Sequence, residues 1–154
     1  CQDSPGKRRG EDAQLLKLAG SLFSSTMRIF SGKDGRVRAI PEKIAGSAGT
    51  IASALNVLSA GCEAGMLKGR DFVPSSDLAL SLALSPGAFP SAELDRQTAL
   101  SYLHKDAISL PDAPRGFVRV CYGGLGLGFV KNLGSRCNNL HPASRRIRMD
   151  ITAE

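Results

Sequence analysis

The feature that most constrains this fold is an extended segment that ends at a pair of glycines. From residue 117 to residue 122 the apolar and basic side chains repeat with a period of two, so they point to alternate sides of a strand. Gly123 and Gly124 then supply the positive φ angles that a two-residue hairpin turn requires. Residues 127–132 form the returning strand. The C-terminal half of the chain is therefore predicted to contain an antiparallel hairpin.

Other periodic segments predict short helices and strands on both sides of this hairpin. Helical spacing of apolar residues predicts a helix beginning at Gln14 and others over 42–56, Asp77–Leu84 and Arg96–His104. Ser75 or Ser76 is expected to cap the third helix, and Asp95 the fourth. The strands expected are 27–30, 36–40, 57–60, a hairpin ending at Pro74, and a last strand in which Ile147 and Met149 face the core while Arg146 and Arg148 face outward.

Length and composition favour a small folded protein made of one domain or two modules. The chain has 154 residues, of which 42% are hydrophobic, and it contains no Trp, so its core must be aliphatic. We predict an α+β fold divided into a disordered leader or linker at residues 1–12, a small α/β module at 13–74 and a β-rich module at 75–154. No apolar run is long enough to span a bilayer, so no membrane partner is expected.

Charge patterning is the strongest functional signal in the residues themselves. The formal net charge is +6, and no acidic residue occurs between Asp112 and Asp150. That stretch carries seven basic residues: Arg115, Arg119, Lys131, Arg136, Arg145, Arg146 and Arg148. Basic side chains clustered on a folded unit favour a surface that faces phosphates. The alternatives are a solvated basic face and a protein-interaction or structural module that binds no RNA.

Cysteine and glycine patterns give weaker signals. The cysteines at positions 1, 62, 121 and 137 and the two histidines have no metal-ligand spacing, so no metal site is expected and the four thiols are expected to be reduced. Cys137 and His141 are close in sequence, but one polar loop more often holds such a pair by chance than for catalysis. The glycines of 123–128 continue into a strand rather than a helix, unlike a nucleotide-binding loop. A lipoprotein anchored at Cys1 is a third alternative.

Four segments, taken in order, resemble a known family. They are VLSAGCEAGMLKGRDFVPSSDLALS, FPSAELDRQTALSYLHKDAISLP, PRGFVRVCYGGLGLGFVKNLGSRCNNLHP and RRIRM. Together they resemble the C-terminal region of RsmF-type, Nop/Sun-family ribosomal RNA 5-methylcytosine methyltransferases. That region holds a ferredoxin-like or pre-PUA element followed by a PUA-like RNA-binding barrel. The family usually has an aromatic residue where His141 stands and a Trp where Arg145 stands.

The resemblance implies a non-catalytic module that docks structured ribosomal RNA for an upstream methyltransferase domain in the same polypeptide. It implies a PUA-like mixed β-barrel with short helices over 75–154, no cofactor in this chain, S-adenosylmethionine for the parent enzyme, a cytoplasmic location and a monomer. The chain has no proline-cysteine motif, so no enzyme activity is expected of it. RNA contacts are expected from Lys131, Asn132, Arg136, Asn138, Asn139, Arg146 and Arg148, with Lys68 and Arg70 as a second group.

Overall fold

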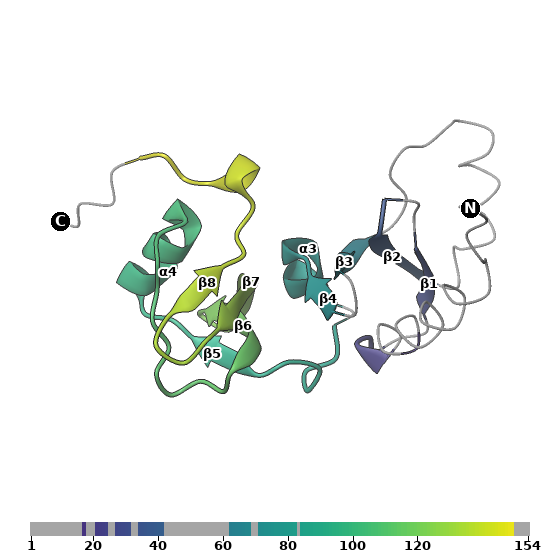
Figure 1. Ribbon diagram of the computed structural model, residues 1–154, viewed down its shortest axis with the longest axis horizontal. Coiled ribbons are helices and arrows are strands. Elements are labelled where there is room, and N and C mark those ends of the chain that lie inside the picture. The colour runs from purple at the N-terminus through teal and green to yellow at the C-terminus, as the bar shows by residue number, and fades with distance from the viewer. Residues whose placement is uncertain are drawn as a thin grey trace, which may run out of the picture. The chain divides into compact units, whose positions relative to one another are not determined.

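The computed structural model describes two compact units of this chain (Figure 1). The described residues are Lys17, 21–24, 27–31, 34–41, 62–68, 71–82 and 84–149. One unit comprises residues 1–73 with 82–88, and the other comprises residues 74–81 with 89–154. Each unit contains one four-stranded sheet. The described part of the chain is therefore mostly β, with a few short helices.

The first unit is built on the hairpins that its turn residues predict. Its strands are β1 (Met27–Ser31), β2 (Arg36–Pro41), β3 (Cys62–Lys68) and β4 (Asp71–Pro74), paired in that order. β1 and β2 pair antiparallel, as do β2 and β3. The expected helix over 42–56 and strand over 57–60 lie outside the described residues, as does the leader 1–12. Of the expected first helix, only Lys17 and Ser21 are described as helical.

The second unit contains the predicted glycine hairpin at the centre of its sheet. Its strands are β5 (Ser91–Glu93), β6 (Gly116–Tyr122), β7 (Leu125–Asn132) and β8 (Cys137–Asn139), in the order β5-β6-β7-β8. β5 runs parallel to β6, and the other pairs are antiparallel. Gly123 and Gly124 have φ angles of 59° and 78°, which fit the turn between β6 and β7. β5 and β8 remain edge strands, so the described strands form an open mixed sheet rather than a closed barrel.

Two short helices belong to this unit, and both begin at the predicted caps. The Ser75 hydroxyl accepts a hydrogen bond from the amide of Leu78 (3.2 Å) at the start of α3 (Ser76–Leu80). Asp95 accepts one from the amide of Thr98 (2.7 Å) at the start of α4 (Arg96–His104). The helix expected over Asp77–Leu84 ends four residues earlier, at Leu80, because Ser81 already has an extended conformation (ψ 127°).

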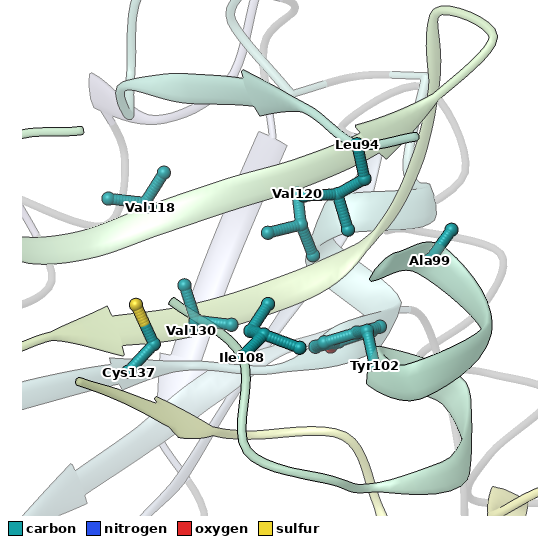
Figure 2. Packing of buried hydrophobic residues seen from close by; sticks show 8 residues of the cluster. All are labelled: Leu94, Ala99, Tyr102, Ile108, Val118, Val120, Val130 and Cys137. Atoms are coloured by element: carbon teal, nitrogen blue, oxygen red, sulfur yellow. The ribbon is translucent and has the colours of Figure 1, made fainter. Parts of the chain in front are cut away.

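The core of the second unit lies between α4 and one face of the sheet (Figure 2). Tyr102 of α4 is fully buried, as are Val118 and Val120 of β6 and Val130 of β7. The remaining members of the cluster are Leu94, Ala99, Ile108 and Cys137. This cluster is aliphatic apart from Tyr102 and Cys137.

The predicted last strand is wrong. Residues Ala143–Arg145 form a short 3-10 helix, η1, and the side chains of Ile147 and Met149 are 36% and 78% exposed rather than buried. The strand that completes the sheet is β8, within the segment that the sequence pattern assigns to a loop. Gly134, with a φ of 98°, lets the chain turn back after β7 so that Cys137–Asn139 pairs with it. The tail is instead attached to α4, because the amide of Ile147 donates to the Leu103 carbonyl (3.1 Å).

Candidate nucleic-acid interface

A row of three side chains crosses the face of the second sheet opposite the α4 core. Phe117 pairs with Lys131, and Lys131 pairs with Asn138, so the three share one face. The Lys131 ammonium nitrogen lies 5.4 Å from the centre of the Phe117 ring, within the range of a cation–π interaction. Phe117 and Lys131 are half-buried and Asn138 is exposed. The row thus presents an aromatic ring, a cation and an amide side by side.

An open depression lies beside the outer edge of β8, and we call it the β8 depression. Its volume is about 370 Å³. Residues that follow the last turn of α4 line one side and residues of β8 line the other: Lys105, Asp106, Ala107, Arg136, Cys137, Asn138 and Asn139. The two sides are joined below the depression, because the amide of Cys137 donates to the carbonyl of Ile108 (3.2 Å). The structure therefore brings together Arg136, Asn138 and Asn139, three of the expected RNA-contact residues.

Asn139 is a structural residue of the β8 depression. Its side-chain nitrogen donates to the carbonyls of Tyr102 (2.8 Å) and Asp106 (3.0 Å), and its side-chain oxygen accepts from the amide of His141 (2.9 Å). All of its polar groups are thus used to tie β8 to the end of α4. Its expected contact with RNA remains a prediction, and the structure gives the side chain this bracing role.

Asn132 is also a structural residue, and its expected contact with RNA is wrong. Its side chain is 2% exposed. The side-chain nitrogen lies 3.0, 2.8 and 3.3 Å from the carbonyl oxygens of Leu110, Ala113 and Pro114, and the side-chain oxygen accepts from the amide of Gly134 (2.9 Å). Asn132 therefore holds the loop before β6, and no part of it faces a ligand.

The polar groups on the rim of the β8 depression differ in how far they are engaged. The Lys105 ammonium donates to the carbonyl of His141 (2.7 Å), and an oxygen of the Asp106 carboxylate lies 2.9 Å from Nδ1 of His104. Arg136 and Asn138 are exposed, and neither makes a side-chain hydrogen bond or ion pair with another described residue. These two side chains are the ones most available to a ligand.

The remaining basic residues of the C-terminal stretch are dispersed. Arg119 donates to the carbonyl of Ala79 (2.6 Å), and Arg145 pairs with the Asp77 carboxylate (2.7 Å), so both serve the packing of α3. Arg146 and Arg148 are exposed on the tail that follows η1. Lys68 is exposed in the first unit, and Arg70 lies outside the described residues. The seven charges therefore do not form one continuous face.

Two residues of this surface, Lys105 and Phe117, were not identified from the sequence. Lys105 has a left-handed conformation (φ 69°) as the residue that ends α4, which turns the chain toward β8. Because Lys105 directly follows the helix expected over Arg96–His104, its position at the end of that helix could have identified it. Phe117 stands two residues before Arg119 on the same side of β6 and would have been found by extending the hairpin register outward from the glycine turn.

The same region offers little support for catalysis or metal binding. Burial raises the pKa of the Cys137 thiol, which opposes formation of the nucleophilic thiolate. Nε2 of His141 is engaged in a hydrogen bond with the carbonyl oxygen of Arg145 (3.0 Å). Within the part of the chain that the structure describes, no group of three His, Cys, Asp or Glu side chains is placed to hold a metal ion. None of the described helices has the length and apolar character needed to cross a membrane.

The sheet, α4 and η1 coincide with a known domain family. Residues 89–147 match the family described as the methyltransferase RsmF PUA domain. These residues are an RsmF-type PUA region. No curated protein matches the chain. The match begins just before β5 and ends at Ile147, so it includes the PUA region's β8 depression and the Phe117–Lys131–Asn138 row.

Proposed function

We propose that this PUA region binds structured RNA and positions ribosomal RNA for a methyltransferase domain that lies upstream in the same polypeptide. The match to the RsmF PUA family carries this proposal. It is supported by exposed cations at Arg136, Arg146 and Arg148, none of which has an ion-pair partner among the described residues. Duplex RNA hides its major-groove base edges from side chains, so docking by charge and shape suits such a surface.

The parent protein under this proposal is a cytoplasmic, monomeric ribosomal RNA cytosine-C5 methyltransferase that uses S-adenosylmethionine. The residues of the PUA region do not fit that cofactor, because the glycine-rich segment 123–128 turns a β-hairpin and opens no helix. The 154-residue chain is therefore proposed to be non-catalytic. Labelled S-adenosylmethionine and unmodified ribosomal RNA should give no methyl transfer with this chain, and transfer above background would contradict the proposal.

RNA binding is tested by the salt dependence of affinity. Each neutralised phosphate releases counterions and contributes about −0.7 to −0.9 to the slope of log affinity against log salt. We expect about three to five contacts, and hence a loss of affinity on the order of a hundredfold between about 50 and 200 mM salt. Fluorescence anisotropy of the full chain with a labelled ribosomal RNA fragment measures both quantities.

Reversing two charges tests whether Lys131 and Arg148 contact the RNA phosphates. Lys131→Glu combined with Arg148→Glu should flatten the salt slope and weaken all RNAs similarly, because phosphate contacts position RNA without reading its sequence. Arg96→Glu, at the opposite end of α4 from the β8 depression, is the control for a single charge reversal away from this surface and should leave the slope nearly unchanged. Thermal melts establish that each variant is folded. If the folded double variant binds with the parent's slope, this surface is merely solvated.

A second candidate function is contact with protein at the tip of the β6–β7 hairpin. Tyr122 and Leu125 face each other across the turn and are 45% and 73% exposed. Exposed apolar pairs of this kind are common in protein interfaces. Replacing both residues with Ser should leave RNA affinity unchanged if this tip serves only a protein partner.

A further inference from the structure

The β8 depression is a preformed site rather than a gap between mobile segments. Asn139 bridges β8 to two carbonyls at the end of α4, and the Cys137–Ile108 hydrogen bond joins the same two segments. Lys105 adds a third connection through the His141 carbonyl. A ligand that enters a site already held in place pays less conformational entropy on binding. The depression is therefore suited to binding a ligand without rearrangement.

The groups around its rim are of mixed chemistry. Arg136 offers a guanidinium fork, and Asn138 offers two N–H donors and one carbonyl acceptor. The Lys105 ammonium uses one of its three donors on the His141 carbonyl and has two left. The Asp106 carboxylate is engaged with Nδ1 of His104 (2.9 Å). A ligand that fits must combine a negative charge with both hydrogen-bond donors and acceptors.

We propose that the β8 depression binds a single unpaired nucleotide of the RNA, with its phosphate at Arg136 and its base edge at the Asn138 amide. This inference rests on the proposed RNA binding and specifies where an unpaired position is recognised.

An unpaired nucleotide fits these groups better than a duplex does. A base that is not paired exposes its Watson–Crick edge, and its donors and acceptors complement an amide side chain. The amino group of a base can donate to the Asn138 side-chain oxygen, whereas a phosphate backbone offers no such donor. The volume of about 370 Å³ lies within the usual range for small-ligand sites, although this depression is open on one side.

The test compares two RNA hairpins with the same stem, one of which carries a single bulged nucleotide. Each of the four nucleotides is placed at the bulge in turn, and the full chain is titrated at fixed salt. The parent should prefer at least one bulged hairpin over the paired one by about fivefold to tenfold, as two or so net hydrogen bonds would give. Asn138→Ala should reduce that preference to about twofold and leave the salt slope unchanged.

Two further variants distinguish the loss of a positive charge in general from the loss of a contact in the β8 depression. Arg136→Ala should lose affinity for the bulged hairpin more than for the paired one, because its phosphate contact lies at the unpaired position. Arg96→Ala removes a cation from the first turn of α4 and should affect both hairpins equally. Both side chains are exposed, so folding should be retained, and thermal melts confirm it. The side-chain amide NMR signals of Asn138 in the parent should also shift when the bulged hairpin is added.

The outcomes distinguish the two proposals. No RNA binding, or binding without salt dependence, contradicts the proposed function itself. Salt-dependent binding with no preference for a bulged hairpin, or a preference that Asn138→Ala leaves intact, overturns the nucleotide site alone. An Asn138 amide signal that stays fixed during saturation with the bulged hairpin also overturns it.

Discussion

The rings of Tyr102 and His141 meet edge to face, with centroids 5.3 Å apart and planes inclined by 63°. The His141 side chain is 5% exposed. Its Nε2 lies 3.0 Å from the Arg145 carbonyl, which only accepts hydrogen bonds, so Nε2 carries the proton. Its Nδ1 is buried without a hydrogen bond to any described residue. The imidazole thus packs against the Tyr102 ring at the cost of one buried polar atom without a partner.

Replacing His141 with Phe should therefore be tolerated. The Phe ring keeps the edge contact with Tyr102 and removes the unpaired Nδ1, which offsets the lost bond to Arg145. We expect the free energy of unfolding of His141→Phe to stay within about 1 kcal/mol of the parent, and that of His141→Ala to fall by about 2–4 kcal/mol. Urea denaturation followed by circular dichroism measures both. Equal losses in the two variants would show that the hydrogen bond, not the ring contact, stabilises this site.

Gly128 should be intolerant of any side chain because of Tyr102. A Cβ at Gly128 would overlap the Tyr102 hydroxyl and lie 3.0 Å from its Cζ. Gly128→Ala should lower the free energy of unfolding by about 1–3 kcal/mol. Tyr102→Phe alone loses the hydrogen bond to the Phe129 carbonyl (3.3 Å) and should cost about 1 kcal/mol.

The double variant should lose less than the sum of the two single losses, because removing the hydroxyl makes room for the new methyl group. Denaturation of the parent and the three variants gives the coupling energy. Strict additivity would contradict the overlap, since it would mean that the two sites do not contact each other.

Stability should decrease in alkaline solution through Tyr102. Burial raises the pKa of Tyr102 to about 12, while the unfolded chain should titrate at its ordinary value of 10.0. The folded state disfavours the Tyr102 phenolate. The contribution of Tyr102 to the free energy of unfolding is therefore fully present below its pKa in the unfolded chain, and it is lost as the pH rises from about 10 to about 12. A difference of about two pKa units amounts to about 2–3 kcal/mol.

The chain has two tyrosines, which makes this titration observable. The ultraviolet phenolate signal should include a step near pH 12 that disappears in Tyr102→Phe. The same variant should lose less stability than the parent between pH 9 and pH 11. Ionisation of Tyr102 near pH 10 in the folded protein would disprove the burial effect.

Asn132→Ala should damage the fold and spare the charge-dependent part of RNA binding. The substitution leaves the carbonyls of the 110–114 loop and the amide of Gly134 without their partner. We expect the free energy of unfolding to fall by about 2–3 kcal/mol. At a temperature where the variant is folded, its salt slope should equal that of the parent. A loss of RNA affinity with unchanged stability would restore Asn132 as an RNA contact.

Local sequence signals predicted much of this fold because local chemistry decides those elements. The glycine pair at 123–124 requires positive φ angles, and Asp95 has an oxygen placed to cap α4, so both elements follow from neighbouring residues. The parallel strand β5 escaped prediction because its three residues show no periodicity of their own. Its existence depends on pairing with β6, which is distant in the sequence.

The C-terminal tail and the candidate site show why local sequence patterns could not predict the rest of the structure. The alternation of Ile147 and Met149 with arginines resembles a half-buried strand, but β8 already occupies the edge of the sheet. Asn132, Asn138 and Asn139 are alike as sequence letters, yet two brace loops and one faces solvent. Register decides this, because Asn138 pairs with Lys131 on the outer face, while Asn139 pairs with the buried Val130.

The contact between Phe117 and Lys131 should affect RNA binding through position rather than charge. The ring faces the Lys131 ammonium at 5.4 Å and restricts where that cation is held. Lys131→Ala should reduce the magnitude of the salt slope by about one contact's share, because a phosphate contact is lost. Phe117→Leu retains the cation and should lower affinity only about twofold to fivefold, as a half-buried cation–π contact would give, with the slope unchanged. In the double variant, Phe117→Leu should add almost nothing to Lys131→Ala. If the effect of Phe117→Leu on affinity persists without Lys131, the ring contacts RNA directly.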